Sequence, residues 1–91
     1  MDADDAWRPR LASCARLKFD PIEKQVMLLF PEAALALNET GAAIVQLCNG
    51  ARSISEIVDR LSEKYGNADR DALMREVVDF IATIRARGLL Q

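Results

Sequence analysis

The chain has 91 residues, of which 51% are hydrophobic and 29% charged, with a formal net charge of -2 and no histidine. This composition fits one small folded domain, excludes a disordered chain, and gives no general attraction to nucleic acid. The absence of histidine removes the side chain most often used for proton transfer near neutral pH, and the commonest nitrogen ligand of metals.

Residues 1–12 show no periodicity and are predicted to form a flexible arm ahead of a single domain over residues 13–91. The start, from Met1 to Asp5, is acidic where a secretory signal would be basic, so we expect a cytoplasmic protein. No apolar stretch reaches the roughly 18 residues needed to span a bilayer. Trp7 could anchor the arm on the core or on a second subunit, although local packing is the favoured interpretation.

Three short strands are predicted next. Ala15 to Phe19 alternates apolar and basic residues, the pattern of a half-buried strand. Gln25 to Phe30 is apolar at every position after the first, which indicates a strand covered on both faces or a strand at an interface. Turn residues from Asp20 to Lys24 join these two strands into an antiparallel hairpin, and Pro31 separates the third strand, Ala33 to Leu37.

Three helices are predicted to follow the strands. Asn38 caps the first helix, which ends near Asn49-Gly50. The segment Ser53-Ile54-Ser55-Glu56 has the spacing of a capping box and begins the second helix, which Gly66-Asn67 ends. The third helix runs from about Asp69 to Arg87. The order predicts the α+β class, with an N-terminal three-stranded antiparallel sheet followed by a three-helix bundle.

The chain shows no motif for catalysis or metal binding. Cys14 and Cys48 lack CxxC spacing and a histidine partner, so we expect no zinc site, disulfide or nucleophilic site. The isolated glycines form no phosphate-binding loop, and the acidic pairs of the third helix are typical of a solvated surface. We therefore predict no metal, no cofactor and no enzymatic activity.

The strongest candidate for a functional surface combines the third strand with the third helix. The strand Ala33 to Leu37 has no charge or proline to discourage pairing, so it could accept an extended peptide as an added strand. The arm, or a second copy in a swapped homodimer, could occupy the same edge.

The third helix has an apolar arc of roughly 160°, against about 100° for a typical surface helix. Met74, Val78 and the stem of Arg85 widen the arc on one side, which indicates a groove wall opposite the strand. Deeper burial of the helix, or contact with the arm, is the alternative. The predicted peptide-binding residues are Ala33, Ala34, Leu35, Ala36, Leu37, Leu73, Met74, Val77, Val78, Ile81 and Arg85.

Several segments in order resemble the PqqD family, the D proteins of pyrroloquinoline quinone biosynthesis, over about Arg16 to Leu90. The matching segments are Arg16-Leu17-Lys18-Phe19-Asp20, Leu28-Leu29-Phe30-Pro31-Glu32, Leu37-Asn38-Glu39-Thr40-Gly41, Ile44 with Leu47-Cys48-Asn49-Gly50, Ile54 with Glu56-Ile57, and Val77 with Phe80-Ile81 leading to Arg87-Gly88-Leu89-Leu90. The chain departs from the family at Asn49 and Glu76, where aspartate is more usual, and has no glycine in the hairpin turn.

The resemblance implies a winged-helix-like RiPP recognition element, which is a peptide chaperone and not itself an enzyme. Proteins of this kind bind the leader of the precursor peptide PqqA as a strand beside the third strand and against the third helix. They present it to the radical SAM enzyme PqqE, and such tethering raises the effective concentration of the reacting segment. On this hypothesis, Ala36→Pro and Val78→Asp each weaken peptide binding.

The alternative hypothesis is a winged-helix regulator that binds DNA, because three helices and a hairpin also describe that architecture. The acidic balance weighs against it. The helices carry mixed charge, as where Arg60 follows Asp59 and Glu76 follows Arg75.

Overall fold

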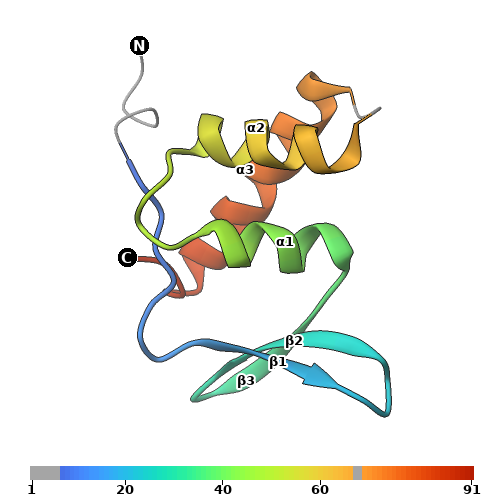
Figure 1. Cartoon of the computed structure of the whole chain (residues 1–91). Helices are drawn as coiled ribbons and strands as arrows, with labels where there is room; N and C mark the ends of the chain where they lie inside the picture. Colours follow the sequence, from blue (N-terminus) through green and yellow to red (C-terminus); the bar gives the residue numbers. More distant parts are fainter. Residues whose placement is uncertain (1–6, 67–68) are drawn as a thin grey trace.

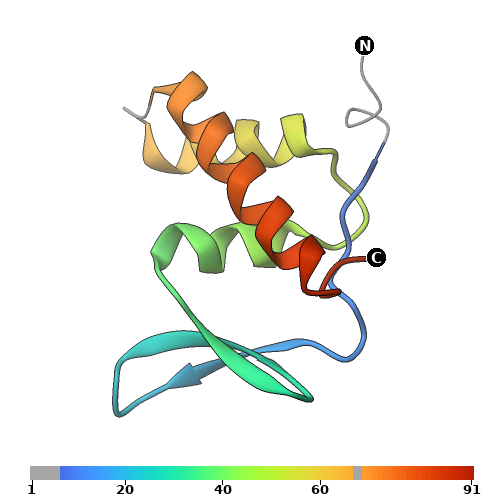
Figure 2. The ribbon, with the colours of Figure 1, turned by 180° about the vertical axis from the view of Figure 1, so that it is seen from behind.

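The computed structural model describes residues 7–66 and 69–91 (Figure 1). Strands β1 (Arg16–Asp20), β2 (Gln25–Phe30) and β3 (Ala33–Leu37) form one antiparallel sheet in the order β1-β2-β3. Helices α1 (Glu39–Leu47), α2 (Ile54–Tyr65) and α3 (Arg70–Ala86) follow. All three helices lie on one side of the sheet (Figures 1 and 2), so the predicted α+β class is confirmed.

The predicted bounds of β2 and β3 are confirmed, whereas β1 begins and ends one residue later than predicted. The shift arises because the N–H of Ala15 donates to the carbonyl of Ala12 at 3.0 Å and so belongs to a turn. The turn between β1 and β2 has no glycine. Lys24 instead takes the left-handed backbone conformation there, with a φ of 54°.

The predicted helix caps are present. The Asn38 side chain accepts the N–H of Gly41 at 2.7 Å at the start of α1, and Ser53 and Glu56 form the capping box of α2. Asp69 caps α3. Gly66 ends α2 with a φ of 55°, and Asn67, the other predicted stop residue, lies outside the described residues.

The hydrophobic core consists of two clusters that meet at α1. The first joins the three helices through Ala43, Ile44, Cys48, Ile54, Ile57, Val58, Leu61, Leu73, Val77 and Ile81. The second joins α1 and the C-terminal end of α3 to the sheet through Ala15, Leu28, Leu37, Ala42, Val45, Ile84 and Leu89. The core therefore fixes α3 relative to the sheet by way of α1.

Residues 7–12 are not the flexible arm that the sequence predicted. Leu11 pairs with Leu90 near the C-terminus, and its N–H donates to the carbonyl of Cys48 at 3.0 Å. These contacts join residues that are far apart in the sequence, so they tie the segment to both α1 and the chain end. The rest of the predicted arm, residues 1–6, lies outside the described residues.

Candidate functional site

β3 is an edge strand, and among the described residues no strand pairs with its outer edge. Its five residues include no charge and no proline, which are the usual devices against unwanted pairing. β1, at the other edge, carries the exposed Arg16 and Lys18. The sheet therefore has one edge protected by charge and one edge open to a further strand.

The pairing of β3 with β2 determines which backbone groups are free. Phe30 and Ala33 pair directly across a two-residue turn, and this makes them a hydrogen-bonded pair of the ladder. Hydrogen-bonded pairs alternate along antiparallel strands, so the same holds for Leu35 and Leu37 opposite β2. The N–H and C=O groups of Ala34 and Ala36 consequently point away from the sheet, toward the open edge.

One flank of α3 lies on the side of β3. Phe80 packs against both core clusters and approaches the first turn of α1, where a Cβ at Gly41 would lie 3.2 Å from the Phe80 ring. Gly41 follows β3 closely in the chain, and Figure 2 shows α3 and β3 on the same face of the molecule. Helical spacing places Glu76, Thr83 and Arg87 on the same side of α3 as Phe80. We call these three residues and Phe80 the Phe80 flank.

The predicted groove wall lies on the other flank. Residues two positions apart on a helix differ by about 200°, so Val78 faces away from Phe80. Val78 and Arg85 line a cavity of about 450 Å³ with Trp7 and Ile54, and the Arg85 guanidinium lies 4.5 Å from the centre of the Trp7 ring. The prediction that Met74, Val78 and Arg85, here called the Trp7 flank, stand opposite β3 is therefore wrong in geometry.

The remaining predicted helix residues belong to the interior. Leu73, Val77 and Ile81 are buried, and all three pack with α2 in the first core cluster. Met74 is partly buried against the same cluster. These side chains hold α3 in place. The predicted strand residues, from Ala33 to Leu37, make up β3, and Leu37 among them is buried in the second core cluster.

Sequence reasoning assigned Phe80 to the core stripe and missed the flank beyond it. A signal was available in Gly41, a glycine inside the first turn of a helix, where it has no role as a helix stop. A Cβ there would lie 3.1 Å from the Asn38 side-chain oxygen as well as close to Phe80. A glycine that permits such a close approach indicates which side of α3 faces the end of β3.

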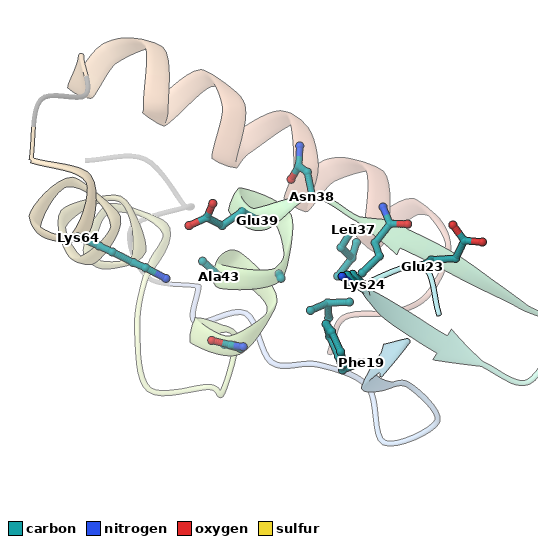
Figure 3. A pocket seen from close by; sticks show the side chains of 12 residues that line it. Phe19, Glu23, Lys24, Leu37, Asn38, Glu39, Ala43 and Lys64 are labelled. Carbon is teal, nitrogen blue, oxygen red and sulfur yellow. The ribbon is translucent and has the colours of Figure 1, made fainter. Parts of the chain in front are cut away.

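A cavity of about 610 Å³ lies on the far side of α1 from α3 (Figure 3). Phe19 and Leu37 come from the sheet, Glu39 from α1 and Lys64 from α2 (Figure 3). Its charged residues are two lysines and two glutamates, so they give no net preference for an anion or a cation. Its position leaves the backbone groups of the β3 edge outside it.

The thiols and carboxylates show no catalytic arrangement in the part of the chain that the structure describes. Cys48 is buried, and this burial raises the pKa of its thiol to about 11. Cys14 is exposed and free. Residues 7–66 and 69–91 contain no group of three or more acidic or cysteine side chains able to hold a metal ion. Their helices include none with the length and apolar character of a membrane span.

This fold and site define a class of protein: a small winged-helix-like domain with an unpaired sheet edge beside a helix, an arrangement suited to strand addition. The family model for Coenzyme PQQ synthesis protein D (PqqD) matches residues 25–90, and the chain belongs to the PqqD family. This confirms the resemblance inferred from the sequence segments.

Relatives and solved structures agree with the assignment. The PqqA binding protein of Rhodopseudomonas palustris (strain TIE-1) is 41% identical over 90 residues, covering 99% of this chain and 87% of the relative. The solution structure of the PqqD truncation of Methylobacterium extorquens PqqCD, a stand-alone RiPP recognition element, matches with a TM-score of 0.78 and 28% identity over 91% of this chain and 87% of that one.

TbiB1 in complex with the TbiA(beta) leader peptide shares the fold, with a TM-score of 0.74 at 23% identity over 90% of this chain and 94% of that one. The DNA-binding alternative finds no support in these comparisons.

Proposed function

We propose that this protein is a peptide chaperone that binds the leader of a PqqA-type precursor along β3 and presents it to a radical SAM enzyme of the PqqE type. The observation that carries the proposal is the open edge at Ala34 and Ala36 beside α3. The PqqA binding proteins among its relatives, and the leader peptide bound to TbiB1, support it. We also propose that the protein works in the cytoplasm and has no catalytic activity of its own.

The backbone edge alone is too weak to hold the peptide. Ala34 and Ala36 offer two donors and two acceptors, each worth about 0.5–1.5 kcal/mol net. Association costs about 4 kcal/mol or more in lost translational and rotational freedom, so the ladder roughly cancels that cost. Inward-facing side chains of the added strand must supply the rest by contact with Leu35 and the Phe80 flank.

The chaperone then acts by tethering. A peptide held on one domain meets a bound enzyme at an effective concentration set by the intervening segment, without any new contact at the reacting bond. The expected result of deleting the chaperone is therefore a loss of modification at low peptide concentration that excess peptide partly restores.

Amide hydrogen exchange tests the proposed binding mode directly. Adding a synthetic precursor peptide should protect the N–H groups of Ala34 and Ala36, because these point outward, while those of Leu35 and Leu37 already face β2. A scrambled peptide of the same composition is the control. Measurable affinity without new protection at Ala34 and Ala36 would contradict strand addition at β3, and sedimentation would show whether a homodimer occupies the edge instead.

A further inference from the structure

The sheet has a second surface that the proposed peptide site leaves unused. Lys18 pairs with Met27, which pairs with Ala36, and Arg16 pairs with Leu29, which pairs with Ala34. Directly paired residues point to the same side of an antiparallel sheet. These six residues therefore share one side, here called the outer face, while Leu17, Leu28 and Leu35 point toward the helices.

Within residues 7–66 and 69–91 no helix covers the outer face, because α1, α2 and α3 lie on the opposite side of the sheet (Figures 1 and 2). Met27 and Leu29 are only partly buried, and neither belongs to a core cluster. A solvated face of an antiparallel sheet normally alternates polar residues with the buried ones. Here the middle of the face consists of methionine, leucine and alanine, which is the composition of a surface that a binding partner covers.

The uncovered outer face explains why β2 is apolar on both of its sides. A strand apolar at every position after the first is either covered on both faces or placed at an interface. Helices cover only the side of Leu28, so the second possibility applies to Met27 and Leu29. Methionine suits such a surface because its flexible, polarisable side chain adapts to the partner.

The charges of the outer face indicate the chemistry of the partner. Arg16 and Lys18 are exposed along the β1 side, and neither forms an ion pair in the described residues. The Asp20 carboxylate, at the end of the same strand, accepts the N–H of Ile22 at 2.9 Å within the hairpin turn. Two unpaired cations beside an apolar strip complement a surface that carries carboxylates next to apolar side chains.

We propose that the outer face is the docking surface for the enzyme that modifies the peptide, which meets it with an apolar patch flanked by carboxylates. The inference rests on the proposed function for the identity of this partner. The peptide adds at the edge of β3 and not on the face, so peptide and enzyme bind together. Charged edge residues that merely discourage strand pairing would explain Arg16 and Lys18, but not Met27 and Leu29.

The test compares two double charge reversals with the same net charge. R16E/K18E alters the outer face, and R60E/R75E alters exposed arginines on α2 and α3. Affinity is measured by calorimetry for a synthetic precursor peptide and, separately, for the radical SAM enzyme with and without peptide. We expect R16E/K18E to bind the enzyme at least about tenfold more weakly than wild type while peptide affinity stays within about twofold. The control variant should bind both normally.

Cys14 provides an independent readout. It lines a hollow of about 380 Å³ with Arg16 and Leu29 at the edge of the outer face, and its thiol is exposed, whereas Cys48 is buried. Alkylation of Cys14 should slow when the enzyme is added to wild type and not when it is added to R16E/K18E. Enzyme binding should also weaken as salt is raised, since exposed charges are screened.

Several results would overturn the inference. Three concern the enzyme: no binding to wild type, unchanged affinity for R16E/K18E, or binding that leaves Cys14 equally reactive. The fourth is a wild-type dimer that R16E/K18E converts to monomers, which would mean that a second copy of this chain occupies the outer face. A wild type that binds the enzyme through this face but does not bind the peptide would contradict the proposed function and leave the docking surface standing.

Discussion

The two flanks of α3 differ in what covers them. On the Trp7 flank, the N-terminal segment lies beside the end of the helix, with the Trp7 ring 4.5 Å from the Arg85 guanidinium, while Val78 remains 41% exposed. On the Phe80 flank, the neighbouring edge of β3 has no strand beside it among the described residues. A wide apolar arc on a helix therefore does not locate a binding site, because the residues that widen this arc lie on the flank away from the open edge of β3.

The largest loss of peptide affinity is expected from a substitution at the open edge of β3. Ala36→Pro removes an outward N–H and places a ring where the added strand would lie, so peptide affinity should fall by at least about tenfold in calorimetry. Ala36→Thr keeps the N–H and suits a strand, so it should retain affinity within about threefold. Equal loss in both variants would mean that the side chain at this position matters and the backbone donor does not.

Two aspartate substitutions, one on each flank of α3, test which flank the peptide contacts. Thr83→Asp places a carboxylate on the Phe80 flank, where peptide side chains would bury it, and should weaken peptide binding by about fivefold or more in calorimetry. Val78→Asp places the same charge on the Trp7 flank and should leave affinity within about twofold. The reverse result would restore the wall of Met74, Val78 and Arg85 that the sequence suggested.

Changes on the Trp7 flank should affect stability and leave peptide binding unchanged. Trp7→Ala removes an aromatic contact and a cation–π interaction with Arg85, and we expect the free energy of unfolding to fall by about 1–2 kcal/mol in urea denaturation. Peptide affinity should change little. A large loss of affinity at unchanged stability would show that the N-terminal segment takes part in recognition.

The smallest effect concerns the cap beneath the same segment. The N–H of Ser53 donates to the Glu56 carboxylate at 2.9 Å, and this hydrogen bond, with the Ser53 hydroxyl and Arg8, lowers the pKa of Glu56 below its ordinary 4.5. A lowered pKa in the folded state means that the stabilisation is complete above the ordinary value and disappears as pH falls through the folded one.

Glu56→Gln keeps a hydrogen-bond acceptor at this position of the capping box but does not titrate. Wild type should therefore exceed the variant in stability near neutral pH, and urea denaturation should show the difference closing in acid. A difference independent of pH between neutral and acidic conditions would contradict this assignment.

Local chemistry explains why most of the fold could be predicted. The strands, the capping box at Ser53 and Glu56, and the cap at Asn38 each depend on a few neighbouring residues. The two caps and the order of the strands are confirmed, whereas the predicted alternation of the first strand fails at Phe19, which is 56% exposed. The flexible arm was wrong for residues 7–12 because their hydrogen bonds reach Cys48 and the chain end, which no local pattern encodes. Tertiary contacts therefore determine the structure of residues 7–12.

The site was predictable only in part for the same reason. The unguarded composition of β3 is visible in the sequence, and its place at the sheet edge follows from the order of strands. Which side of α3 faces that edge depends on how α1 crosses the sheet. A helical wheel places Phe80 and Val78 on different flanks of α3 but does not say which flank faces the strand edge, whereas the close approach of Phe80 to Gly41 does.

The spacing of the free groups on β3 has a consequence for how a peptide is positioned. Ala34 and Ala36 lie two residues, or about 7 Å, apart along the strand, and the backbone of every peptide repeats with the same period. A ligand that slides by two residues would regain the same ladder, so the main chain holds it without identifying it. Choosing the correct alignment falls to side chains that fit beside Phe80, and a leader of regular alternating sequence would occupy several alignments at once.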